Sequence, residues 1–376
     1  MKPRRILLLT TDLEIGGTPT VVRDLAVRLN DPPTVHVEVA CLGGWGPVAA
    51  QLALSRIPVT ALDASSTRDL IVIAKLVRLF RRRHFDTCLS FLVHANVSAA
   101  LASLVCPGTR FLQSIQTTQP GPRWHWMLQA LAQLAAERVV VPSSAAARAS
   151  IRWARVAREK CIVIPNAVDA SAFLHPRPTF ASPRLKLGFL GRLDPVKRVG
   201  DLLETVALLG RDVELHIFGD GAERERLHTR THELSLSDRV VFHGSIARPQ
   251  QALDQLDLLV LPSIAEGFGL VLIEAMAAGV PVIATDVPGI CDVVEHERTG
   301  LLVPARSPRA IAAAVIRLRD DPCLRERLVE QGMATVRQRF SFAAVMPRYR
   351  ALLRLPSHAT ACVQPTDRAC DRSDRR

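Results

Sequence analysis

The chain alternates between short apolar runs and longer segments in which apolar positions recur with helical spacing. In the first half, the apolar runs predict strands at Ile6–Thr10, Val35–Cys41, Thr87–Leu92, Arg110–Ile115, Val139–Val141 and Cys161–Ile164. The segments between them predict helices at Pro19–Leu29, Asp69–Arg83, Val97–Leu104, Arg123–Glu137 and Ala145–Arg155. Because strands and helices alternate, we expect a parallel sheet with helices on both faces.

The stretch Asn166–Pro183 interrupts this alternation, since it contains Pro176, Pro178 and Pro183 and has little periodicity. It predicts a linker between domains. Beyond it the alternation resumes, with strands expected at Leu185–Leu190, Glu214–Phe218, Val240–His243, Leu258–Leu261 and Val280–Ala284. Helices are expected at Val199–Leu209, Glu223–Leu234, Phe268–Ala278, Pro308–Arg319 and Cys323–Phe340.

The pattern therefore predicts two α/β domains, one over residues 1–175 and one over residues 184–340. Residues 341–356 are expected to form a terminal helix that returns to the first domain, and the polar tail 357–376 is expected to be disordered. Ligands of open α/β sheets bind at the carboxyl ends of the strands, so two such domains place a ligand in the cleft between them.

Composition narrows the class of protein. Hydrophobic residues make up 48% and charged residues 22%, which is an ordinary globular balance. The first ten residues resemble a signal peptide, but Asp12 and Glu14 interrupt the apolar run, so we expect a first strand. The apolar stretch Phe91–Cys106 is too short and too polar to span a bilayer. The eight cysteines include no CxxC pair, so we expect reduced thiols and a cytoplasmic location.

The net charge of +12 is concentrated in the first half, where residues 1–176 hold 20 Lys and Arg against 11 Asp and Glu. A basic surface attracts phosphorylated substrates, anionic lipid or nucleic acid. Nucleic acid is the weakest of these partners because the chain has no nucleic-acid-binding motif. The basic cluster Arg78, Arg81–Arg83 and His84 suits anionic lipid or a pyrophosphate acceptor, although cations also stabilise a helix C-terminus.

The strongest chemical signal surrounds Glu266 and Glu274, which follow a predicted strand and are separated by seven residues. The turn Gly267-Phe268-Gly269-Leu270 leads into a helix, whose free N–H groups suit a diphosphate. Gly267 and Gly269 let a ligand approach the backbone closely. The two carboxylates suit hydroxyl-bearing groups such as a sugar and a ribose, but acids also favour any helix start.

Three other turns add to this signal. Arg192 and Lys197 follow the strand that ends near Gly191, and both cations suit phosphate oxygens. The alternative is that they are surface charges on a solvated loop. Gly219 lies in a tight strand–helix turn that we expect to border the bound nucleotide. It is not a dinucleotide fingerprint, because Arg224 occupies the third small position. Gly16 and Gly17 follow the first strand and suit either a ligand or a plain turn capped by Thr18.

Together these motifs resemble the retaining GT-B glycosyltransferases of family 4, over residues 4–355. Glu266 to Glu274 is similar to that family's E-x7-E motif and is followed by a similar Ala-Met-Ala-x-Gly-x-Pro sequence. The segment from Gly191-Arg192-Leu193 to Lys197 resembles its phosphate-binding segment. Pro165-Asn166-Ala167-Val168-Asp169 resembles its hinge phrase, with alanine in place of glycine, and Gly16-Gly17 resembles its N-terminal glycine pair.

The resemblance implies two facing Rossmann-like domains and a nucleotide-sugar donor. Arg192 and Lys197 would hold the donor diphosphate, and Glu266 would face the transferred sugar. Glu274 would bind the ribose, while the backbone around Phe268, Gly269 and Leu270 would bind phosphates and sugar hydroxyls. The family generally works without a bound metal, so neither a metal nor a cofactor is expected.

The chain departs from the family at one position. Many members carry a histidine after the strand that here ends near Ile115, and the corresponding residue is Gln116, which cannot exchange protons. His94 is an alternative polar group at the cleft, and Asn166 is a further candidate for contact with the acceptor or sugar. The Trp-rich segment 117–126 suits sugar stacking, a membrane interface or simple packing onto a helix.

The leading hypothesis is therefore a retaining glycosyltransferase that uses a glycan or lipid-linked acceptor in cell-surface polysaccharide or glycolipid biosynthesis, at the inner face of a membrane. A sugar-nucleotide epimerase would be expected to have more acid and base groups in the cleft. A nucleotide-sugar-binding regulatory module without transfer activity is the remaining alternative, and Gln116 is the residue that favours it.

Overall fold

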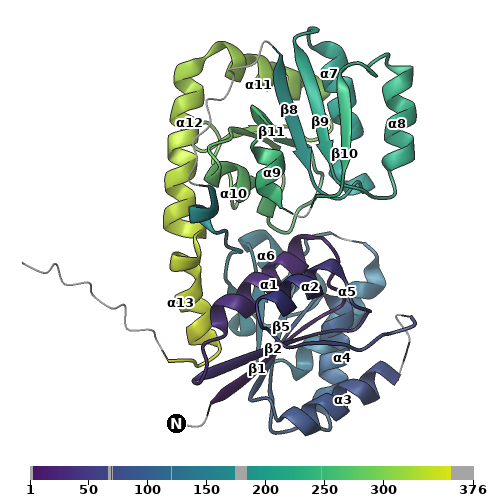
Figure 1. Cartoon of the computed structure of the whole chain (residues 1–376), viewed down its shortest axis with the longest axis vertical. Coiled ribbons are helices and arrows are strands. Elements are labelled where there is room, and N and C mark those ends of the chain that lie inside the picture. The colour runs from purple at the N-terminus through teal and green to yellow at the C-terminus, as the bar shows by residue number, and fades with distance from the viewer. Residues whose placement is uncertain are drawn as a thin grey trace, which may run out of the picture.

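The computed structural model describes residues 3–66, 69, 71–119, 121–173, 184–246 and 248–356. Most of the predicted linker, residues 174–183, and the predicted disordered tail, residues 357–376, lie outside the described residues. Two α/β units are arranged end to end along the long axis of the molecule, and a helical segment at the C-terminal end runs beside both (Figure 1).

The first unit is built on a seven-stranded sheet in which all paired strands are parallel. Its order is β3-β2-β1-β4-β5-β6-β7. The strands are β1 (Arg4–Thr10), β2 (Val35–Cys41), β3 (Val59–Ala61), β4 (Thr87–Phe91), β5 (Arg110–Ser114), β6 (Arg138–Val141) and β7 (Cys161–Val163). The helices that cover it are α1 (Gly17–Leu29), α2 (Pro47–Leu54), α3 (Ile71–Arg83), α4 (Val93–Ser103), α5 (Arg123–Ala132) and α6 (Ser144–Trp153).

The second unit has a six-stranded parallel sheet of order β10-β9-β8-β11-β12-β13. Its strands are β8 (Leu185–Leu190), β9 (Val213–Phe218), β10 (Val240–Gly244), β11 (Leu258–Leu261), β12 (Val282–Thr285) and β13 (Leu301–Val303). Its helices are α7 (Gly200–Leu208), α8 (Arg224–Glu233), α9 (Pro249–Leu253), α10 (Leu270–Ala277), α11 (Pro308–Asp320) and α12 (Pro322–Thr335). The predicted architecture of two Rossmann-like domains is confirmed.

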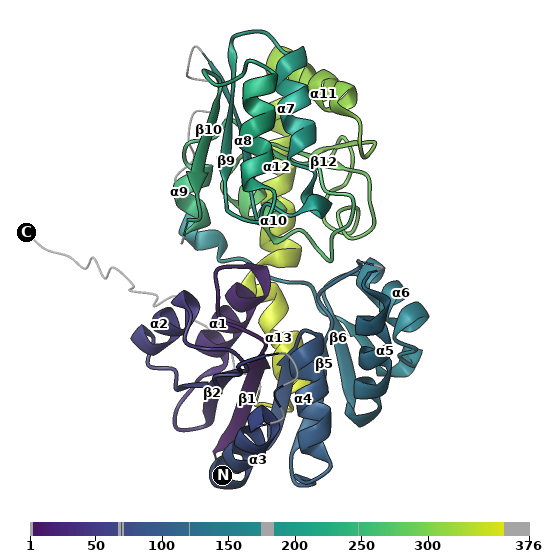
Figure 2. The same ribbon diagram turned by 90° about the vertical axis from the view of Figure 1, so that its right-hand side faces the viewer.

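The chain crosses between the units twice. It leaves the first unit after β7 and returns through a π-helical turn, Val336–Phe340, into α13 (Phe342–Leu352). Val345 and Tyr349 of α13, and Leu353 directly after it, are buried in the same apolar cluster as Val22 and Leu25 of α1. The two crossing segments meet where the Val168 amide donates to the Phe340 carbonyl at 2.9 Å. α13 is thus part of the core of the first unit (Figure 2).

The strand order places the loops that carry the predicted motifs. In each sheet the order reverses once, between β1 and β4 in the first unit and between β8 and β11 in the second. A crevice forms at the carboxyl ends of the strands where the order reverses. Gly16 and Gly17 follow β1, His94 follows β4, Lys197 follows β8 and Glu266 follows β11, so each of them lies at such a reversal.

Candidate functional site

The centre of the candidate site is an ion pair between Lys197 and Glu266. The ammonium of Lys197, in the loop after β8, contacts Glu266 Oε1, in the loop after β11. Glu266 Oε1 also accepts a hydrogen bond of 2.8 Å from the hydroxyl of Ser263, which is fully buried. The Lys197 and Glu266 side chains are 22% and 11% exposed. Such partial burial strengthens their attraction and leaves the cation accessible from one side.

Arg192 occupies a different environment from Lys197, although both follow β8. Its side chain is 73% exposed, and its Nε lies 2.6 Å from Asp194 Oδ2 in the same loop. The structure therefore joins Lys197 and Glu266 directly and leaves Arg192 at the surface beside them. An exposed ion pair of this kind contributes little stability and costs little to break.

The turn Glu266-Gly267 lies against the first unit. The Thr118 hydroxyl donates to the Glu266 carbonyl, and the Ser143 hydroxyl donates to the Gly267 carbonyl, both at 2.6 Å. A Cβ added to Gly267 would lie 2.1 Å from the Gln116 carbonyl oxygen, so only glycine permits this approach. The motif on the second unit and the polar loop after β5 therefore form one site at the junction of the units.

α10 begins at Leu270, two residues later than the predicted start at Phe268. Gly269 precedes it in the left-handed conformation, with φ of 84°, and this conformation favours glycine. The Phe268 ring is buried and packs edge-on against Phe340. Its side chain therefore belongs to the core, and only its backbone remains for the predicted contact with a ligand.

Glu274 is buried and Glu266 nearly so, but the charged groups near Glu274 are Asp24 and Arg23 of α1 rather than Lys197. Burial, helped by the nearby Asp24 of α1 and opposed by Arg23, raises the pKa of Glu274 to about 7. Burial also raises the pKa of Asp24, which Arg23 lowers. The two acids thus form a pair in which the Asp24 charge on α1 acts on the Glu274 carboxyl of α10. The spacing of Glu266 and Glu274 did not indicate this pair, because Asp24 lies 250 residues away in the chain.

We expect Glu274 to make stability depend on pH. Its pKa is raised in the folded protein, so its contribution is complete below its ordinary pKa of 4.5 and is lost as the pH rises through about 7. Glu274→Gln should remove this dependence and raise the free energy of unfolding at pH 8 by about 3 kcal/mol relative to the parent. Denaturant unfolding from pH 5 to pH 8 measures the difference.

The matched control for Glu274 is Glu330→Gln, which changes an exposed glutamate of α12. It should leave the unfolding curve of the parent unchanged at every pH. If Glu274→Gln and the parent lose stability equally between pH 5 and pH 8, Glu274 is already charged in the folded protein.

Three polar residues of the first unit were expected near the acceptor or the sugar. Gln116 Nε2 donates to Ser114 Oγ at 2.7 Å, and Gln116 Oε1 accepts from Asn166 Nδ2 at 3.3 Å. Asn166 Oδ1 is buried without a hydrogen-bond partner in the part of the chain that the structure describes. Gln116 and Asn166 therefore form one amide pair next to Gly267. Within the described residues, the buried Asn166 Oδ1 of this pair accepts no hydrogen bond.

His94 lies in a separate cluster of rings. Its ring centroid is 5.3 Å from that of His125 and 6.0 Å from that of Trp124, and the Trp124 and His125 centroids are 4.0 Å apart. Burial and the neighbouring His125 lower the pKa of His94, so its ring is neutral at pH 7. The structure brings together His94 and the Trp-rich segment, which the sequence presented as two independent features.

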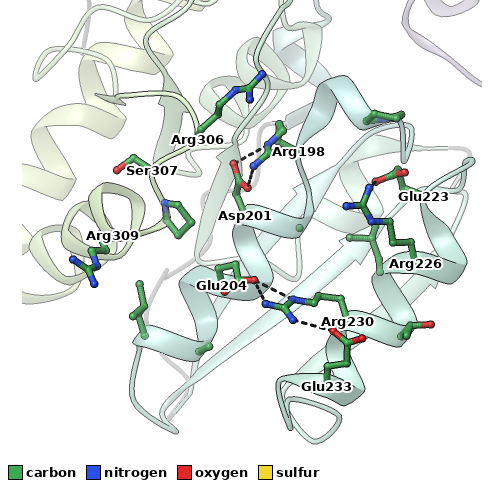
Figure 3. Close-up of a pocket in the computed structure, with 17 residues that line it drawn as sticks. Arg198, Asp201, Glu204, Glu223, Arg226, Arg230, Glu233, Arg306, Ser307 and Arg309 are labelled. Carbon is green, nitrogen blue, oxygen red and sulfur yellow. Dashed lines mark hydrogen bonds and ion pairs between the residues drawn. The ribbon is translucent and has the colours of Figure 1, made fainter.

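A cavity of about 1150 Å³ lies away from these residues, between α7, α8 and the start of α11. One ion pair, Arg230 with Glu204, joins its α8 and α7 walls (Figure 3). The pairs Arg198–Asp201, Arg226–Glu223 and Arg230–Glu233 each lie within one wall. The cavity contains none of the predicted site residues. Its position behind the Lys197 loop makes it a groove of paired surface charges rather than part of the candidate site.

The described residues contain no group of three or more His, Cys, Asp or Glu side chains placed to hold a metal ion. Within the same residues, no helix has both the length and the apolar character needed to cross a membrane.

Two family models together match most of the chain. Residues 15–172 match the model described as Glycosyltransferase Family 4, and residues 172–335 match that described as Glycosyl transferases group 1. These matches cover the two units and all of the predicted site residues.

Curated relatives extend the comparison. The lipopolysaccharide core biosynthesis glycosyltransferase LpsD of Rhizobium meliloti is 40% identical over 162 residues, which cover 43% of this chain and 44% of that protein. The match therefore spans less than half the length of that relative. The 2-deoxystreptamine glucosyltransferase of Streptomyces kanamyceticus is 28% identical over 337 residues, which cover 81% of this chain and 83% of that protein.

Solved structures show the same fold. The Anabaena HepE protein in complex with UDP and glucose has a TM-score of 0.85 at 23% identity, over 93% of this chain and 99% of that chain. The sucrose-phosphate synthase of Thermosynechococcus elongatus has a TM-score of 0.80 at 23% identity, over 93% of this chain and 98% of that chain.

Proposed function

Because both of its units match glycosyltransferase families, the chain belongs to the GT-B glycosyltransferases, and we propose that it transfers a sugar from a nucleotide-diphosphate donor with retention of configuration. The observation that carries this proposal is the contact of Lys197 with Glu266, where the second unit meets the first. A cation and an acid held together there suit a donor that has an anionic diphosphate beside a hydroxylated sugar.

In this proposal Lys197 and Arg192 bind the diphosphate, and the start of α10 adds backbone N–H groups to the same anion. Cleavage of the bond between sugar and diphosphate leaves positive charge on the sugar and negative charge on the leaving nucleotide. Lys197 is fixed by Glu266 before the donor arrives, so it stabilises the developing charge without reorganisation. Glu266 faces the transferred sugar, and Glu274 faces the ribose.

The open space beside the glycine pair Gly16–Gly17 supports a donor near β1. A Cβ on Gly17 would meet no atom within 4 Å, and one on Gly16 would lie 3.7 Å from Pro19, so packing requires glycine at neither position. α1 begins at Gly17 without a side-chain cap, so the alternative in which Thr18 caps a plain turn is wrong. In contrast, a Cβ on Gly219 would lie 1.9 Å from the Gly191 carbonyl oxygen.

This contrast predicts opposite phenotypes. Gly219→Ala should destabilise the fold by about 1–3 kcal/mol, because φ is 141° and the new methyl group meets the backbone of the β8 loop. Gly17→Ala should keep the melting temperature of the parent but raise KM for the donor about tenfold, about 1.4 kcal/mol of binding, if a ligand occupies the open space. A Gly17→Ala protein with an unchanged KM would show that no donor approaches this turn.

The acceptor is proposed to be a glycan or a lipid-linked glycan bound by the first unit, in cell-surface polysaccharide or glycolipid biosynthesis at the inner face of a membrane. Its support is the positive charge of residues 1–176 and the cluster of His94, Trp124 and His125 near the cleft. Aromatic rings stack on the apolar faces of sugars.

The test is the release of nucleoside diphosphate from a panel of sugar donors, with and without an acceptor extract. Acceptor-dependent release supports transfer. Donor binding without turnover on any extract would instead support the binding module, which is favoured by the tethering of Gln116 to Ser114 and Asn166. Comparing His94→Ala with Gln116→Ala in this assay identifies which side chain affects turnover.

A further inference from the structure

Helix α5 has two faces of different character. Trp126, Gln129 and Ala132 are buried against the first unit. On the opposite face, Met127, Leu131 and Leu134 are 68%, 67% and 68% exposed. Leu134 belongs to the short 3-10 turn Gln133–Ala135 that continues α5. Large apolar side chains at this spacing form a stripe that the protein leaves uncovered.

Helix α4 continues this stripe, because it packs beside both α5 and the turn Gln133–Ala135. Leu101 near its end, and Leu104 and Val105 just after it, are also exposed. We name these six side chains together the α4–α5 apolar surface: Leu101, Leu104, Val105, Met127, Leu131 and Leu134. The two helices lie side by side on one side of the first unit, with α3 next to α4 (Figure 2).

The border of this surface is basic. Residues 71–136 hold seven Lys and Arg and a single acid, Asp86. Arg78, Arg81 and Arg82 near the end of α3 are exposed. α3 packs beside α4, and the two helices end shortly before β4 and β5, whose amino ends are paired through Thr87 and Arg110. Arginines therefore lie at the same end of the first unit as Leu104 and Val105.

Apolar side chains surrounded by arginines suit an anionic bilayer. Leucine and methionine enter the boundary between headgroups and acyl chains, and the arginines pair with acidic lipid headgroups. A second copy of this chain would bring an equal excess of positive charge against the first, which opposes a symmetric dimer through this surface.

We propose that the α4–α5 apolar surface docks the protein on an anionic lipid bilayer and presents a lipid-linked acceptor to the cleft. The docking claim stands on the surface alone, and only the acceptor rests on the proposed function. The surface extends toward the carboxyl ends of the strands through Trp124, which is half exposed at the start of α5 and packs against His94 at the start of α4. A lipid-linked acceptor with its tail in the bilayer would therefore have its sugar beside Trp124, on the same face of the first unit.

The experiment is flotation of the full chain with vesicles of phosphatidylcholine and phosphatidylglycerol in equal parts, at low salt. Leu131→Gln with Leu134→Gln should weaken partitioning at least about tenfold, because two apolar side chains no longer enter the lipid. Arg81→Gln with Arg82→Gln should weaken it about thirtyfold, and high salt should have a similar effect on the parent.

The matched controls change exposed residues of the second unit. Leu208→Gln on α7 is the apolar control, and Arg327→Gln with Arg337→Gln is the basic control; both should float like the parent. Circular dichroism melting confirms that each variant folds. A parent that does not float, or Leu131→Gln with Leu134→Gln floating like the parent, overturns the inference. So does a concentration-dependent dimer that this apolar double substitution dissociates.

Donor turnover separates this inference from the proposed function. Nucleotide release measured without vesicles should be the same for the parent and for Leu131→Gln with Leu134→Gln, because neither leucine lies near Lys197 or Glu266. A parent that floats but turns over no donor supports the docking surface and contradicts the proposed function. A parent that transfers sugar but does not float contradicts only the docking surface.

Discussion

Replacing Lys197 with alanine is expected to lower kcat about 100- to 1000-fold, which corresponds to about 2.7–4 kcal/mol of lost transition-state stabilisation. Lys197 is held by Glu266 and is only partly exposed, so its charge acts in a region of reduced dielectric. The diphosphate carries its greatest negative charge as the bond to the sugar breaks. The loss should therefore appear mainly in kcat, measured as nucleoside diphosphate release at saturating donor.

Lys160→Ala provides the control, because this lysine precedes β7 on the first unit, away from the β8 and β11 loops. It should retain the kcat of the parent. Lys197→Ala should lower the melting temperature to some extent, because Glu266 loses its counterion while 11% exposed, but Glu266 keeps the hydrogen bond from Ser263. Circular dichroism melting therefore has to show that the variant is folded at the assay temperature. Parental turnover in a folded Lys197→Ala protein would move the diphosphate site away from the β8 loop.

Glu266→Gln is expected to lower kcat about 100-fold. The amide preserves the size of the side chain and can still accept from the Ser263 hydroxyl, so the turn should remain folded. It removes the negative charge that positions the Lys197 ammonium and that faces the sugar as positive charge develops on it. We expect a smaller change in donor affinity than in kcat, because the interaction strengthens in the transition state.

The double variant tests whether Lys197 and Glu266 act together. Two groups in direct contact should be non-additive, so Lys197→Ala with Glu266→Gln should lose less activity than the product of the two single losses. Glu330→Gln, on the outer surface of α12, should keep parental turnover. Strict additivity, measured by the same nucleotide release assay, would mean that the ion pair has no part in placing either charge.

The periodicity of the sequence predicted the architecture well where elements are long or strongly apolar. β2, β8 and β11 have the predicted bounds, because each is a mostly buried parallel strand with a clear apolar run. β3 and β13 have only three residues each, too few to establish a period. α2 was also not predicted, since Pro47–Leu54 is apolar on nearly every side and shows no helical stripe.

The candidate site was likewise predictable from the sequence only in part. Local motifs indicated Lys197 and Glu266, because each lies in a loop directly after a strand. The contacts that hold the Glu266–Gly267 turn could not be predicted, since Thr118 and Ser143 are 148 and 124 residues distant in sequence. Nor could the sequence distinguish the exposed Arg192 from the paired Lys197, because both are cations in one short loop.

The return of α13 to the first unit has a consequence for recombination between related enzymes. The second unit is in effect an insertion, with its two junctions side by side at Val168 and Phe340. A chimera that exchanges the second unit must therefore be cut at both junctions, keeping residues 342–355 with the first unit. A second unit exchanged between these two junctions would move as one cassette, while the core of the first unit, closed by Tyr349 against α1, stays unchanged.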